Sequence, residues 1–292
     1  MTDPSRAIDA GASPLEPPTA QPPVVEFQNV TKTYDAGTPR AFTAIKDVTF
    51  SVPDHPNRGE FVAILGPSGC GKSTILRLIA GLSPQHPVTT GQVLVDGNPV
   101  TGPGADRGMV FQAYTSFDHR NVINNVAFGL ECRGVPKEER TELAREWIAR
   151  VGLDPDADGP KYPHQLSGGM RQRVAIARSL ILHPRIILMD EPFGALDPVT
   201  RGRMQDLLVG LWRELEATVF FVTHSIEEAV YLGDRIAILS NSPGTVLREL
   251  DVPAPDRPAR EMQREPEFLE RVFEIREMIE KLEEQNEARN GA

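Results

Sequence analysis

The nine residues Gly66-Pro67-Ser68-Gly69-Cys70-Gly71-Lys72-Ser73-Thr74 decide the fold class. They follow an apolar run, Gly59–Leu65, that has the pattern of a strand, and they open a stretch that has the pattern of a helix. Glycines there let backbone N–H groups close around phosphate oxygens, and the start of the helix adds a partial positive charge. Lys72 is placed to reach the β- and γ-phosphates and Ser73 to bind Mg²⁺. The stretch therefore predicts a phosphate-binding loop, with a plain glycine-rich turn as the alternative.

A second motif lies where another apolar stretch ends. Ile186–Met189 reads as a buried strand, and Asp190 and Glu191 follow it directly. Ligand sites in parallel sheets open at the carboxyl ends of the strands. We expect Asp190 to hold Mg²⁺, directly or through water, and Glu191 to polarise the water that attacks the γ-phosphate. Two acids alone would be a solvated strand end, but beside a phosphate loop they are a candidate catalytic pair.

A third motif predicts a second anion-binding helix end. Leu166 is followed by Ser167, Gly168 and Gly169 at the start of a predicted helix, 168–182. A serine hydroxyl and free N–H groups at such a point can cap the helix or bind an anion. One chain thus has two candidate phosphate-binding helix ends.

The rest of the chain alternates strands with helices, which predicts an α/β fold whose parallel sheet is covered on both faces. Further predicted strands are Val24–Phe27, Ala44–Val52, Val93–Val95, Gly108–Phe111 and Val219–Val222, and further predicted helices are Lys137–Val151 and Arg201–Glu216. Few strand signals occur in 113–166, which predicts an inserted helical subdomain.

The two ends of the chain differ in composition from its middle. Residues 1–23 are rich in Pro and Ala, which predicts a disordered leader before a folded domain over 24–250. Residues 251–292 begin Pro-rich and then form a predicted helix, Pro266–Arg289. Its narrow apolar stripe consists of Phe268, Val272, Ile275, Ile279 and Leu282. We expect this stripe to pack on the core domain of the same or a neighbouring subunit, with a regulatory or dimerising segment as the alternative.

Composition excludes several classes of function. The 292 residues carry 31 Lys and Arg against 41 Asp and Glu, a net charge of −10, so nucleic acid is not expected as a partner. No apolar run approaches the ~20 residues that cross a bilayer. Only two cysteines occur, and the start of the chain does not read as a secretory signal, which favours a cytosolic compartment.

Taken together, these motifs resemble the ATP-binding subunit of an ABC transporter. In that family ATP lies between the phosphate loop of one subunit and the Leu-Ser-Gly-Gly segment of the other, which would explain the two anion sites. Four further residues match family elements in order. Tyr34 resembles the aromatic that stacks on adenine, Gln112 the Q-loop glutamine, Asp197 the D-loop aspartate and His224 the switch histidine that bridges to the γ-phosphate.

The resemblance assigns a role to each candidate residue. It implies that Glu191, His224 and Lys72 carry catalysis, and that Ser73, Gln112 and Asp190 hold Mg²⁺. Nucleotide would be bound by residues 66–74, Tyr34, Gln112, Asp197, and Ser167, Gly168 and Gly169 of a partner. It also implies a P-loop core with a parallel sheet, an antiparallel β subdomain and the inserted helical subdomain.

Within the family, Glu191–Asp197, Asn121–Leu130 and Arg264–Phe268 look like bacterial importers of the nitrate, sulfonate and taurine group. That implies a second ATPase subunit, transmembrane permease subunits, an indirect periplasmic solute-binding protein, and a place on the cytoplasmic face of the inner membrane. One departure is Asp118-His119, where this group commonly has Pro-Trp in the segment that receives the permease. The alternatives are an exporter or lipid-transport subunit, a soluble ABC ATPase acting on nucleic acid, and a scaffold that only binds ATP.

Overall fold

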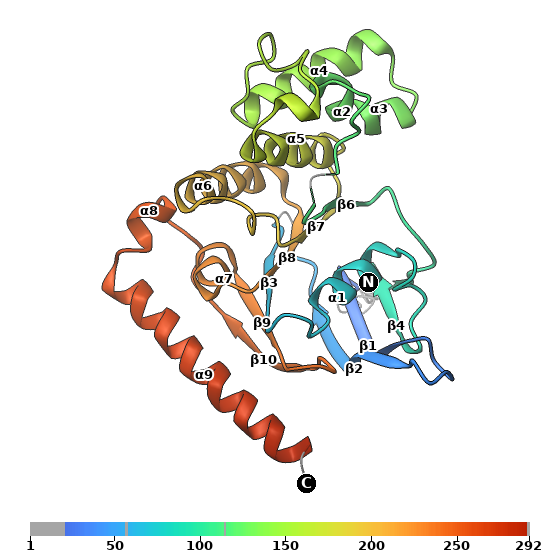
Figure 1. The fold of residues 1–292 in the computed structure, drawn as a ribbon, viewed down its shortest axis with the longest axis vertical. Coiled ribbons are helices and arrows are strands. Elements are labelled where there is room, and N and C mark those ends of the chain that lie inside the picture. The colour runs from blue at the N-terminus through green and yellow to red at the C-terminus, as the bar shows by residue number, and fades with distance from the viewer. Residues whose placement is uncertain (1–20, 56–57, 114, 291–292) are drawn as a thin grey trace, which may run out of the picture.

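A computed structural model describes residues 21–55, 58–113 and 115–290 (Figure 1). Most of the predicted leader, residues 1–20, lies outside this range. Within it, no helix is both long and apolar enough to span a membrane.

The centre of the molecule is a six-stranded sheet in the order β10-β9-β3-β8-β7-β6. Its strands are β3 (Phe61–Leu65), β6 (Arg107–Val110), β7 (Ile186–Asp190), β8 (Thr218–Thr223), β9 (Arg235–Leu239) and β10 (Val246–Asp251). All neighbours pair in parallel except β10, which lies antiparallel to β9 at the edge. The predicted parallel sheet is confirmed, and β9 and β10 are strands that the sequence reading missed.

The central strands β3, β7 and β8 are buried on both faces, which is why they are nearly continuous apolar runs. In β3, Phe61, Ala63 and Leu65 face one hydrophobic cluster, whereas Val62 and Ile64 face another. The first cluster contains residues of α5 (Gly168–Leu180), α6 (Pro198–Leu215) and α7 (Ile226–Leu232), and the second contains residues of α1 (Lys72–Ala80).

The second cluster also joins the sheet to an antiparallel sheet of order β2-β1-β4-β5. Its strands are β1 (Val25–Tyr34), β2 (Phe42–Val52), β4 (Thr90–Val95) and β5 (Asn98–Pro99). The prediction ended β1 at Phe27, but the strand continues to Tyr34 through shifts in register, with Asn29 at φ 49°. This continuation places Tyr34 beside α1 and thus beside the phosphate loop.

The inserted helical subdomain is confirmed and forms one end of the molecule (Figure 1). It holds α2 (Val122–Val126), α3 (Phe128–Cys132) and α4 (Lys137–Arg150), and α2, α3 and α4 all pack on α5. Trp147 and Ile148 of α4 are buried there. Its exact bounds, 113–166, stay a prediction.

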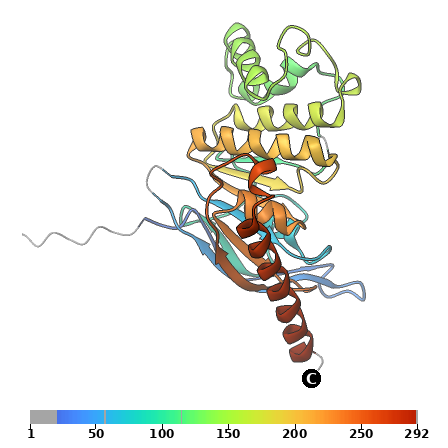
Figure 2. The same ribbon diagram turned by 90° about the vertical axis from the view of Figure 1, so that its left-hand side faces the viewer.

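The C-terminal segment comprises α8 (Ala259–Met262) and the long α9 (Pro266–Asn290), which runs along the outside of the core (Figures 1 and 2). Phe268, Val272 and Ile275 are buried, and α9 packs against α7 of the same chain. Ile279 is partly buried against the same core. The predicted stripe therefore packs on its own core domain.

Candidate nucleotide-binding and catalytic site

The predicted phosphate loop connects β3 to α1. Gly69 and Gly71 adopt φ values of 81° and 97°, a left-handed backbone that favours glycine. A side chain at residue 71 would also collide with Ile45, so glycine is required there on two grounds. The buried Lys72 Nζ donates to the carbonyl oxygens of Gly66 and Pro67, at 2.8 and 2.9 Å, which holds the ammonium inside the loop.

Two of the three predicted Mg²⁺ ligands, Ser73 and Asp190, contact each other. Ser73 Oγ donates to Asp190 Oδ1 at 2.7 Å, and Arg77 Nη2 lies 3.5 Å from Asp190 Oδ2. Asp190 is buried at the end of β7, so a hydroxyl and a carboxylate, both hard oxygen ligands, converge on one point. Among the described residues no cluster of three or more His, Cys, Asp or Glu could hold a metal. A Mg²⁺ ion bound mainly by phosphate and water needs no such cluster, so these two side chains fit it.

Glu191 is the centre of the candidate catalytic group. Its Oε2 accepts a hydrogen bond from Gln112 Nε2 at 3.2 Å and lies 3.4 Å from His224 Nδ1. Lys72 Nζ lies 3.9 Å from its Oε1. Lys72, Gln112, Glu191 and His224 follow β3, β6, β7 and β8, whose carboxyl ends meet at one edge of the sheet. Strand order thus gathers four residues that are far apart in the sequence.

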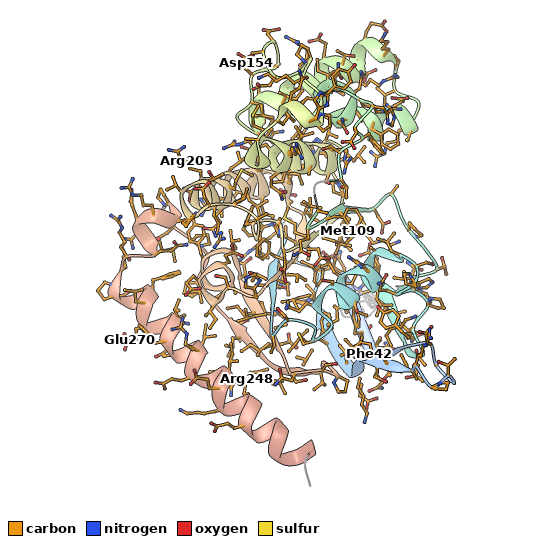
Figure 3. The ribbon with its side chains drawn as sticks, viewed as in Figure 1. Phe42, Met109, Asp154, Arg203, Arg248 and Glu270 are labelled. Carbon is orange, nitrogen blue, oxygen red and sulfur yellow. The ribbon has the colours of Figure 1, made fainter. Side chains whose placement is uncertain are left out.

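An open pocket of about 340 Å³ lies over the phosphate loop. Tyr34 lines it, and Tyr34 Oη shares a hydrogen bond of 3.2 Å with Thr74 Oγ1. Phe42, at the start of β2, lines the same pocket and is 51% exposed. Figure 3 places Phe42 at the opposite end of the molecule from Asp154 of the helical subdomain. The sequence reading missed Phe42, although a large aromatic just after a Thr-Pro turn was a usable signal.

The structure does not bring the Ser167 motif to this pocket. Ser167 Oγ accepts from Met170 N at 3.3 Å and caps α5, and the motif is exposed. Asp197 Oδ1 caps α6 in the same way, and its hydrogen bonds with Thr200 lower the pKa of Asp197. A side-chain carbon at Gly169 would lie 3.0 Å from Thr200, so the two caps share one surface. Neither Ser167 nor Asp197 lines the pocket.

The fold and this site define a P-loop ATPase of the ATP-binding cassette class. A family profile described as ABC transporter matches residues 45–194. The chain belongs to the ABC transporter family, and it is an ATPase of the kind that is coupled to transport.

Relatives and solved structures agree with that assignment. A nitrate import ATP-binding protein from Synechocystis is 48% identical over 77% of this chain and 85% of its own length. A taurine import ATP-binding protein from Rhizobium johnstonii is 46% identical over 84% and 92%, respectively. A solved dimeric ATP-binding cassette, in a post-hydrolysis state with ADP and Pi, matches with a TM-score of 0.67 and 36% identity, over 78% of this chain and 99% of its own.

Proposed function

We propose that this chain is the ATPase subunit of an importer for a small solute of the nitrate, sulfonate or taurine type. The observation that carries the ATPase part of the proposal is the position of Glu191, whose carboxylate lies near Lys72, Gln112 and His224. A carboxylate there can accept a proton from water that attacks a bound γ-phosphate. His224 then contacts the same phosphate, and Lys72 offsets its negative charge.

We also propose that Ser73, Asp190 and Gln112 hold Mg²⁺ when nucleotide binds. The Ser73–Asp190 contact already pairs two oxygen ligands, and the nitrogen of the Gln112 amide faces Glu191, so the oxygen of that amide is the group for the metal. The metal would supply neutralisation of charge on the phosphate oxygens.

A second copy of the chain completes the site in this proposal. The surface shared by the Ser167 motif and Asp197 lines neither the loop pocket nor the small hollow between Glu191 and His224, among the described residues. Two copies facing each other would bring each Ser167 motif to the partner's phosphate loop. The dimeric arrangement of the solved relative supports this view.

The importer class and the solute rest on the relatives. The names of matching proteins from Synechocystis and Rhizobium johnstonii describe nitrate and taurine import, which favours an importer over an exporter or lipid transporter. Transport requires transmembrane permease subunits and, for an importer of this group, a periplasmic solute-binding protein. The chain would then work at the cytoplasmic face of the inner membrane.

The test is to purify the native complex from membranes and reconstitute it with its co-purifying partners. We expect two permease copies, a solute-binding protein encoded nearby, and ATP-dependent uptake of labelled nitrate, taurine or a related sulfonate. A complex that moves lipid outward, or that takes up none of these solutes with its binding protein present, would overturn the importer assignment.

The segment around Asp118 and His119, which is predicted to face the permease, is held in place by a buried side chain. The buried Asn125 accepts from Phe117 N at 2.7 Å, and its Nδ2 lies 3.1 and 2.9 Å from the carbonyl oxygens of Phe117 and Arg120. The ring of Phe117 packs on that of Phe128, with centroids 4.6 Å apart. Asp118 and His119 are exposed on this fixed loop. They are therefore suited to contact a partner.

We predict that Asp118→Lys lowers permease association and transport by about tenfold while the isolated subunit keeps its ATPase rate within about twofold, because exposed charges at an interface act on partner recognition. Co-purification with the permease and the ATPase rate of the isolated chain measure the two effects. Asp156→Lys, at an exposed site on the helical subdomain, is the control. An equal loss of both activities would place Asp118 in the active site instead.

A further inference from the structure

The turn that carries His224 is clamped by one buried hydroxyl. Thr223 Oγ1 accepts from Ser225 N at 3.0 Å, which closes the backbone around His224. The same hydroxyl donates to Glu228 Oε2 at 2.6 Å. Thr223 and Glu228 are 2% and 7% exposed, so the bond between them lies away from water, where a hydrogen bond to a charged group is strong.

Glu228 is also bound to the other side of the turn. Its backbone N donates to Ser225 Oγ at 3.2 Å, which caps α7. Its Oε1 accepts from Gln205 Nε2 at 3.5 Å and lies 3.8 Å from Arg201 Nε. Burial raises the pKa of Glu228, which the Thr223 hydroxyl and the Arg201 charge partly oppose. Burying a charged carboxylate costs free energy unless it is paired and hydrogen-bonded. Glu228 makes several of these compensating contacts with the turn that carries His224.

The His224 imidazole has few side-chain contacts that could fix its direction. The His224 side chain is 59% exposed, and among the described residues Glu191, with Oε2 at 3.4 Å, is the one carboxylate within ion-pair distance of it. An exposed ring with a single long contact takes its direction from the backbone that carries it. The Thr223–Ser225 turn is therefore what aims His224 at Glu191.

The C-terminal segment reaches this turn by two routes. Gln263 Nε2, just after α8, donates to Gln205 Oε1 at 3.4 Å, and Gln205 in turn contacts Glu228. Arg276 of α9 lies 3.4 Å from Glu227 Oε1, whereas Ser225 Oγ donates to Glu227 Oε2 at 2.9 Å. Packing of α9 on α7 holds both routes in place.

We propose that Thr223 and Glu228 are positioning residues for His224, and that the C-terminal segment supports them through Gln205. This inference rests on the catalytic role proposed above for His224. The C-terminal segment then acts on the hydrolysis step, although none of its described side chains lines the nucleotide pocket.

Thr223→Val removes the hydroxyl but keeps the shape of the side chain. We expect a loss of kcat on the order of tenfold, with the affinity for ATP within about twofold, because His224 acts on hydrolysis and not on initial binding. Thr223→Ser, which keeps the hydroxyl, should retain kcat within about twofold. Thr218→Val is the matched control, since it makes the same change at the far end of the same buried strand. Steady-state ATPase assays and nucleotide titration of the full chain give both quantities.

The deciding measurement is a double-mutant cycle with His224→Ala. If Thr223 acts through His224, adding Thr223→Val to His224→Ala lowers kcat no further. A further tenfold loss, or wild-type kcat in Thr223→Val alone, would overturn the positioning role. If Thr223→Val fails to fold, Glu228→Ala carries the same cycle with the same expected pattern. A wild-type rate in His224→Ala would instead contradict the proposed site, so the two failures are distinct.

A separate measurement tests whether the C-terminal segment supports the Thr223–Ser225 turn. Gln263→Ala should lower kcat by about twofold to threefold in the wild-type background. It should have no effect in Thr223→Val, because Gln263 acts through Gln205 and Glu228 on the Thr223 hydroxyl, which that variant lacks. The same loss in both backgrounds, or none in either, would show that Gln263 does not act on the turn.

Discussion

Glu191→Gln is expected to lower the ATPase rate of the full chain by a factor of about 10² or more, the range for a positioned acid–base group. The substitution removes the proton acceptor but keeps the size of the side chain and its ability to bond Gln112. Residue 191 has a φ of 44°, a left-handed conformation that strains any residue with a side chain. Glutamate and glutamine both carry one, so the backbone strain is the same in the two proteins. A loss of rate therefore reports on the carboxylate and not on a rearranged loop.

Glu191→Gln should also leave ATP bound. With MgATP, the variant is expected to shift from monomer to dimer in light scattering, because nucleotide that is not cleaved keeps two subunits together. ADP in place of ATP is the control and should leave a monomer. A Glu191→Gln protein that hydrolyses at the wild-type rate would contradict the catalytic assignment.

Ser167→Arg, added to Glu191→Gln, is expected to abolish the ATP-driven dimer. Ser167 lies at the exposed start of α5, on the surface that should meet the partner's phosphate loop. An arginine there fills the space that the partner's γ-phosphate must enter. It also removes a helix cap worth ~1 kcal/mol, which alone is too little to prevent dimer formation.

Two controls separate these effects. Ser167→Ala removes the cap without adding bulk, so it should weaken the dimer but not abolish it. Thr141→Arg adds the same side chain to α4 in the helical subdomain and should leave the dimer intact. ATP-driven dimers that survive Ser167→Arg would overturn the facing arrangement of the two subunits.

The parts of the site that the sequence predicts are those whose signal is local. The strand, the glycine loop and the helix start are contiguous from Gly59 to Ala80, and Asp190 and Glu191 directly follow an apolar strand. In each case the residues that determine the local structure are neighbours in the sequence. The family resemblance added Gln112 and His224, whose single polar side chains carry no such reason by themselves.

The parts that were missed depend on contacts between distant residues. β1 runs past Phe27 because register shifts accommodate Asn29, and the pairing strands β2 and β4 decide this. The bonds of Glu228 reach Gln205, and those of Gln205 reach Gln263, so no window of sequence contains the cluster. Buried polar groups of this kind interrupt the apolar periodicity from which a helix is predicted.

The order of strands in the central sheet sets when the ATP site can form during synthesis. The phosphate loop is complete in sequence at Thr74, yet β3 lies between β8 and β9, which are translated about 150 residues later. At typical translation speeds that interval lasts roughly 10 to 30 s. For that time the apolar strand Phe61–Leu65 has neither of its neighbours and is a target for chaperones. A nascent chain that stops before Thr218 carries the whole phosphate-binding motif but neither of the strands that flank β3.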